Sequence, residues 1–122
     1  MSPRRDIAMT PEEIDAFLGS QSQVVVAGVP SQGAVQGAVG HLRYEGGRVG
    51  FSLRADDPVA GLLAHDDRAC CVVEQFPSYY EIMGVLLHGR ATRHEGDRDG
   101  LATFDLDVDK VVSFDFGKLA GD

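Results

Sequence analysis

Short hydrophobic segments, continuous or alternating with polar residues, run through most of this chain and predict an antiparallel β-sheet. Two strands are expected at residues 69–74 and 79–92, with a break at Pro77, which cannot donate to a strand ladder. The second strand is longer than average and contains Gly84 and Gly89. Glycine inside a strand usually marks a bulge or a close backbone approach. A long, bent, mostly apolar strand of this kind is expected in the wall of a closed sheet.

Four more strands are expected around this pair, at residues 23–29, 34–44, 48–53 and 110–116. The segment Glu45-Gly46-Gly47 predicts a hairpin between two of them. Residues 94–109 are expected to form an acidic loop region, in which 105–109 alternates as a solvated edge strand would. The strand at 34–44 consists largely of glycine and other residues with small side chains in its first half. This predicts either a tightly curved barrel strand or a flat backbone surface against which a planar ligand could lie.

Two short helices are predicted from their start signals. Thr10 is expected to cap the first helix, with Pro11 at its first position and Glu13 completing a capping box. Asp57 is expected to cap the second helix, followed by Pro58. The chain is therefore expected to form a single mainly β domain over residues 1–122, a small antiparallel barrel of six to seven strands preceded by a polar arm at 1–9.

Charge and composition narrow the functional classes. The chain has 122 residues, 43% of them hydrophobic, and 19 acidic against 11 basic residues give a net charge of −8. This balance argues against a nucleic-acid or anionic-membrane surface, because both require clustered Lys and Arg. The adjacent Cys70 and Cys71 favour reduced core thiols over a disulfide framework. With no apolar run of transmembrane length, we expect a soluble, cytoplasmic protein.

The chain lacks the short motifs of common catalytic and nucleotide sites: G-x-S-x-G, the P-loop and GxGxxG do not occur. Its four histidines show no recognised metal spacing, so we expect no metal site. His41 is the most notable of them, because it directly follows the small residues of the strand at 34–44.

The order of segments resembles the FMN-binding split barrel of the pyridoxamine 5'-phosphate oxidase-like superfamily, particularly its flavin- and deazaflavin-dependent oxidoreductases. Four stretches carry the resemblance in the same order along the chain: residues 5–18, 44–52, 62–68 and 79–91. They read RDIAMTPEEIDAFL, YEGGRVGFS, LLAHDDR and YYEIMGVLLHGRA.

This resemblance implies a homodimer with a cofactor in each of two grooves between the barrels. The cofactor would be FMN or a deazaflavin, its phosphate near residues 52–63 and its ring system along residues 34–41. The cofactor supplies hydride transfer and the protein supplies orientation, so the expected activity is oxidoreduction of a small molecule, with catalytic residues unknown. The residues that the resemblance places against the cofactor are Gln36, His41, Ser52, Leu53, Arg54, Tyr80 and Met83.

The chain departs from the resemblance at the expected phosphate segment. Relatives usually carry Lys or Arg here, whereas this chain has Asp56-Asp57-Pro58-Val59 and keeps only Arg54 nearby. Losing two charge-assisted hydrogen bonds costs roughly 3–6 kcal/mol. Met83 likewise stands where many relatives have Arg.

These departures leave an alternative open, in which the scaffold has lost its flavin. The groove would then bind another apolar ligand, or support cofactor-free acid–base chemistry. The residue types that could serve such chemistry are His41, Glu74, Tyr80 and His88. Haem binding, known among split-barrel relatives, is the remaining alternative.

Overall fold

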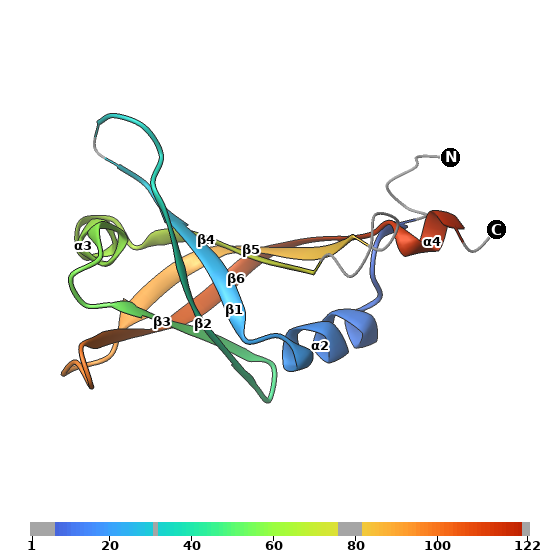
Figure 1. The fold of residues 1–122 in the computed structure, drawn as a ribbon, viewed down its shortest axis with the longest axis horizontal. Coiled ribbons are helices and arrows are strands. Elements are labelled where there is room, and N and C mark those ends of the chain that lie inside the picture. Colours follow the sequence, from blue (N-terminus) through green and yellow to red (C-terminus); the bar gives the residue numbers. More distant parts are fainter. Residues whose placement is uncertain (1–6, 31, 76–81, 121–122) are drawn as a thin grey trace.

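Six antiparallel strands close into a barrel in the computed structural model, which describes residues 7–30, 32–75 and 82–120 (Figure 1). The strands are β1 (Gln23–Gly28), β2 (Gly37–Glu45), β3 (Arg48–Arg54), β4 (Arg68–Gln75), β5 (Met83–Arg93) and β6 (Leu101–Asp115). Their order around the barrel is β1-β2-β3-β6-β5-β4, and β4 pairs with β1 to complete the circle. The prediction of a mainly β, closed antiparallel sheet is confirmed.

The barrel core follows from the alternation along each strand, because successive side chains point to opposite faces. Phe51 of β3 and Phe104 of β6 lie directly opposite each other, and their rings stack inside the barrel with centroids 5.0 Å apart. Val26, Cys71 and Val85 are also fully buried. The outward-facing positions of the same strands are thus free to form a surface.

Helix α2 (Pro11–Ser20) begins as predicted. Thr10 Oγ1 accepts the Glu13 amide at 3.1 Å, and Glu13 Oε1 accepts the Thr10 amide at 2.9 Å. Phe17 and Leu18 of this helix are buried against the barrel core. The expected capping box and its buried face are therefore confirmed.

Helix α3 (Pro58–His65) lies near the other end of the barrel (Figure 1). Asp57 caps it as predicted, and Val59 and Leu63 are buried. A further helix, α4 (Gly117–Ala120), follows β6 and was not predicted. Lys118 of α4 forms an ion pair with Glu13 of α2 at 2.7 Å, which joins the two helices. In the described part of the chain, no helix is long and apolar enough to cross a bilayer.

The two glycines of β5 are both required by close approaches. The strand register shifts between His88 and Gly89, and a side chain at Gly89 would collide with the backbone carbonyl of Asp107. At Gly84 the missing side chain leaves room for the ring of Phe114 on the neighbouring strand. The expected bulge and close approach are confirmed.

The last strand was placed wrongly. It begins at Leu101 rather than at residue 110, so most of the expected acidic loop at 94–109 is strand. Asp105 points outward while Phe104 and Leu106 are buried, and β6 pairs with both β3 and β5. Asp105 and Leu106 therefore lie in the barrel wall between β3 and β5, whereas Asp107 and Val108 pair with β5 alone, as the expected solvated edge would. The expected break at Pro77 and the start of the strand at residue 79 lie outside the described residues.

Candidate functional site

An apolar row crosses the outer face of five neighbouring strands. Each residue in it lies directly opposite the next in the strand register. Val39 is 69% exposed, Val25 37% and Val112 41%, and the other two members are half-buried. The apolar row, in order from β2 to β6, is Val39, Val25, Val72, Leu86 and Val112. Contiguous exposed apolar surface of this kind commonly marks an interaction or ligand site.

Residues with polar side chains lie on the same face, on both sides of the apolar row. On one side His41 lies opposite Gln23, and Glu74 of β4 faces outward. On the other side Cys70 lies opposite His88, which lies opposite Lys110. The structure thus brings three of the four residues considered for acid–base chemistry, His41, Glu74 and His88, onto one face. Tyr80, the fourth, lies outside the described residues.

Cys70 and His88 line a shallow hollow of about 370 Å³ beside the apolar row. The Cys70 Sγ and His88 Nε2 atoms are 4.0 Å apart, and both side chains are half-buried. Burial raises the pKa of the Cys70 thiol, so the thiol stays protonated near neutral pH and is not an activated nucleophile. The hollow is completed mainly by small and apolar residues of β1, β4 and the segment before β2, including Ala27, Val29 and Val35.

The proximity of Cys70 and His88 was not predicted from the sequence. In the register between β4 and β5, Arg68 pairs with Arg90 and Gln75 pairs with Met83, which places Cys70 opposite His88. The strands expected at 69–74 and 79–92 lie closer together in the sequence than β4 and β5 do, and their spacing did not define a register. A one-residue error in register exchanges the faces of a strand, so this contact could not be found without the true turn length.

A second, smaller hollow of about 230 Å³ lies directly on the apolar row. Gln23 and Glu74 line it together with Val25, Val39 and Val72. One amide and one carboxylate therefore border an otherwise apolar surface, an arrangement typical of small-molecule sites.

Of the seven residues expected at the cofactor, four lie at the surface of β2 and β3 or next to it. His41 lies directly opposite Ser52, whose hydroxyl is 3.3 Å from that of Thr103. Arg54 ends β3, and Gln36 is exposed just before β2. Leu53 is different: its side chain is 1% exposed in the barrel core, so only its backbone could reach a ligand.

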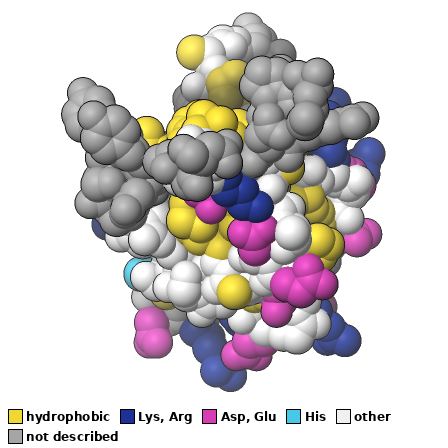
Figure 2. All heavy atoms as spheres, turned by 90° about the vertical axis from the view of Figure 1, so that its right-hand side faces the viewer, with side chains coloured by type: hydrophobic (Ala, Val, Ile, Leu, Met, Phe, Trp, Pro, Cys, Tyr) yellow, Lys and Arg dark blue, Asp and Glu magenta, His cyan; other side chains and the backbone are white. Residues whose placement is uncertain are grey.

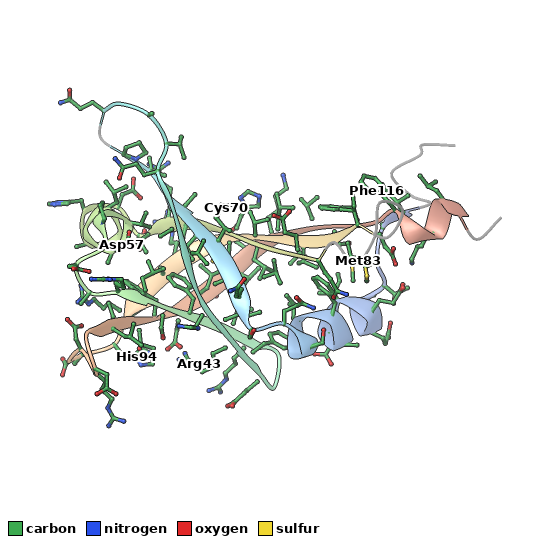
Figure 3. The ribbon with its side chains drawn as sticks, in the orientation of Figure 1. Arg43, Asp57, Cys70, Met83, His94 and Phe116 are labelled. Atoms are coloured by element: carbon green, nitrogen blue, oxygen red, sulfur yellow. The ribbon has the colours of Figure 1, made fainter. Side chains whose placement is uncertain are left out.

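Met83 lies at the opposite end of the chain's fold from Asp57 in the expected phosphate segment (Figure 3). It starts β5, is half-buried against the core, and lies opposite Gln75 and Asp115. Within one chain, Met83 and Asp57 therefore do not share a groove (Figure 3). Tyr80, expected on the same strand, is not among the described residues.

In the expected phosphate segment, the groups that could bind an anion are hydrogen-bonded to carboxylates of the same segment. Arg54 binds both carboxylate oxygens of Asp56, and Asp57 accepts the amide of Val59 at the start of α3. The hydrogen bonds with Asp56 raise the pKa of Arg54, and those with Arg54 hold the pKa of Asp56 below its ordinary value. These residues do not fit a phosphate well, because the Arg54 guanidinium and the Val59 amide, two groups that would bind one, already have carboxylate partners.

Two other surface features were considered as sites. At the α4 end, Phe116 and Leu119 are exposed, and Figure 2, which looks onto this end, shows hydrophobic side chains at the surface. On the opposite side of the barrel from Cys70, Asp105 bridges Arg43 and His94 at 2.6 and 2.7 Å (Figure 3). The Asp105 cluster is exposed, and exposed ion pairs contribute little. Among the described residues, no three metal-ligating side chains converge.

Comparison with known proteins gives a likeness in fold. No protein-family model matches the sequence, and no curated protein matches it. The conserved protein Rv2991 of Mycobacterium tuberculosis superposes with a TM-score of 0.82 at 19% identity, over 98% of this chain and 93% of that one.

Two further solved structures carry functional names. An FAD-binding protein of Mesorhizobium loti has a TM-score of 0.73 at 10% identity, over 88% of this chain and 96% of that one. A predicted pyridoxamine 5'-phosphate oxidase of Listeria innocua has a TM-score of 0.69 at 11% identity, over 84% and 95%. At these identities the likeness concerns the fold.

Proposed function

Since the chain has the split-barrel fold of the pyridoxamine 5'-phosphate oxidase-like proteins, we propose that it is a homodimer that binds a small, mostly apolar molecule on the outer face of β1, β4 and β5. The observation that carries the proposal is the apolar row, which is continuous over five strands and has the hollow at Cys70 beside it. A second copy would cover the row, and the hollow at Cys70 would hold the ligand.

The second copy is the partner that this face fits best. An isologous interface requires a self-complementary patch, and a row of valines and a leucine packs against its own symmetry mate without unpaired charges. The nearest charged side chains, Glu74 and Lys110, lie beside the row rather than in it, where they can stay hydrated. With a net charge of −8 on each chain, an apolar contact is better suited to self-association than a charged one.

The hollow beside Cys70 offers a ligand mainly small and apolar walls, with Arg68 and Asp109 as the charged residues of its lining. The protonated Cys70 thiol is a weak hydrogen-bond donor, and the His88 imidazole can donate or accept. Such a site would orient an uncharged molecule through one polar atom and hold the rest by burial. We place the protein in the cytoplasm, because both thiols are free and a reducing compartment keeps them so.

A titration with Nile red, a neutral apolar dye without phosphate, tests the binding site. We expect the dye's fluorescence to rise saturably with the unmodified protein. Cys70→Phe fills the hollow from a half-exposed position and should weaken binding at least tenfold. Gly61→Ala on α3, where nothing lies within 4 Å of the new methyl group, is the control and should bind as the unmodified protein does. Equal binding by all three proteins would contradict the proposal.

A second candidate is a flavin- or deazaflavin-dependent oxidoreductase, in which FMN or a deazaflavin would supply hydride transfer. It is favoured by the exposure of Arg54, whose side chain is 77% exposed. Exposed ion pairs typically contribute no more than about 1 kcal/mol, so a strong anion could compete with Asp56 for this guanidinium. His41 and Ser52 on the adjacent strands would then face the ring system.

The visible absorption spectrum separates the two candidates. The purified protein should be colourless under the first proposal and should stay so after FMN or a deazaflavin is added and removed by gel filtration. A retained yellow chromophore would support the second candidate. The same spectrum would report a bound haem, which would contradict both.

A further inference from the structure

The segment from the end of β3 to the start of α3, residues 54–59, carries one cation, Arg54, and two of its three guanidinium nitrogens bind Asp56. Its Nε lies 3.0 Å from Asp56 Oδ1, and its Nη2 lies 3.0 Å from Asp56 Oδ2. This two-pronged geometry is the one in which arginine binds a phosphate. Asp56 therefore occupies one of the guanidinium edges that a phosphate would use, the one formed by Nε and Nη2.

The start of α3 is engaged in the same way. A helix N-terminus binds anions through the free amides of its first turn. Here the first helical residue is Pro58, which has no amide hydrogen, and the amide of Val59 donates to Asp57 Oδ1 at 2.8 Å. The Asp57 carboxylate also lies where the helix dipole favours a negative charge. A second anion at this position would meet a carboxylate.

We propose that Asp56 and Asp57 are built-in substitutes for a phosphate, so that this segment rejects phosphorylated cofactors and keeps its shape without a bound anion. The inference concerns residues 54–59 and is independent of the apolar row and its hollows.

The two carboxylates contribute in different ways. Arg54 and Asp56 are both well exposed, so their pair alone is easily exchanged for another anion. Asp57 cannot move aside without removing the cap from α3, and its neighbour Asp56 stays close through the chain even when displaced. We therefore expect that both aspartates are needed to exclude a phosphate, and that both must be substituted before a phosphate can bind.

The test compares FMN with riboflavin, which has the same ring system but no phosphate. The ratio of their dissociation constants isolates the contribution of the phosphate group. Binding is followed by flavin fluorescence in the unmodified protein and in Asp56→Ser/Asp57→Ser. Serine keeps the cap of α3 without its charge, so the double variant should remain folded. We expect little preference for FMN in the unmodified protein, and a preference at least tenfold larger in the double variant, about 1.4 kcal/mol.

Two controls assign the effect to this segment. Glu12→Gln/Glu45→Gln removes the same charge from exposed positions on α2 and the β2–β3 hairpin and should leave the ratio unchanged. Adding Arg54→Gln to the double variant should abolish the gain. Tight FMN binding by the unmodified protein with a large preference over riboflavin would overturn the inference, as would a double variant that gains no preference for FMN. Neither result depends on dye binding or on the oligomeric state, so failure here is distinguishable from failure of the proposed function.

Discussion

The adjacent cysteines show how a strand assigns two identical residues to different environments. Cys71 points into the barrel and is fully buried, whereas Cys70 points outward beside His88. Burial raises the pKa of the Cys71 thiol from an ordinary 9.0 to about 12. Only Cys70 therefore has both the exposure and the neighbours to take part in binding.

The buried thiol predicts a loss of stability at alkaline pH. Above pH 9.0 the unfolded chain releases the Cys71 proton while the folded chain keeps it up to about pH 12. The unfolded state then binds fewer protons, so stability falls as the pH rises through this window. Urea unfolding should show the unmodified protein losing about 1.4 kcal/mol more per pH unit above pH 9 than Cys71→Val does. Parallel pH profiles for the two proteins would contradict this assignment.

The glycines predict opposite effects at two positions. Gly89→Ala places a methyl group against the Asp107 carbonyl at the β5 bulge and should lower the free energy of unfolding by about 1–3 kcal/mol. Gly61→Ala, in open space on α3, should raise it by about 0.4–1 kcal/mol through the unfolded state. Thermal unfolding of both variants tests the pair, and a Gly89→Ala variant as stable as the unmodified protein would show that the bulge tolerates a side chain.

At the scale of the element, the caps make helix starts readable from the sequence. Asp57 illustrates this: its carboxylate accepts the Val59 amide, and the helix it starts buries Val59, Ala60 and Leu63. Asp57→Ala should lower the free energy of unfolding by about 1 kcal/mol, and Asp57→Ser should restore most of it. Asp56→Ala, next to it in the chain, should leave the unfolding midpoint unchanged because Asp56 is exposed. Equal effects of the two alanine variants would contradict the capping role.

Elements with local signals were predicted well, and those without were not. A few neighbouring residues determine each of three features: the capping box at Thr10, the cap at Asp57 and the Gly46–Gly47 turn. Both glycines of that turn have positive φ. The start of β6 has no such signal. Its outward aspartates made residues 94–109 look like a loop, whereas pairing with β3 and β5 holds them in the wall.

At the scale of the whole molecule, the candidate site depends on register around a closed barrel. The apolar row joins residues from Val25 to Val112, and no local pattern shows that they share one face. The sequence did single out His41, Glu74 and His88 as chemically interesting, and they do lie on this face. It could not show which residues lie between them, because that arrangement is made by four separate strand pairings.

The row also sets the scale of the proposed association. Burying an exposed valine side chain contributes roughly 1.5–3 kcal/mol. Covering the exposed parts of Val39, Val25 and Val112 on both copies is then on the order of 6 kcal/mol, against an association cost of roughly 4–15 kcal/mol. The row therefore offsets much of the association cost without exceeding its upper range, so the proposed dimer has little free energy to spare and one charge within the row should dissociate it.

The mass of the protein in solution tests this account most directly. Light scattering at tens of micromolar should give twice the chain mass of 13.1 kDa for the unmodified protein. Val112→Asp should give the single-chain mass, whereas Val111→Asp should remain dimeric. Val111 is the matched control because it is 46% exposed, close to the 41% of Val112, but points to the other face of β6. A mass of 13.1 kDa for the unmodified protein, or equal effects of the two substitutions, would contradict the proposal that the apolar row is covered by a second copy.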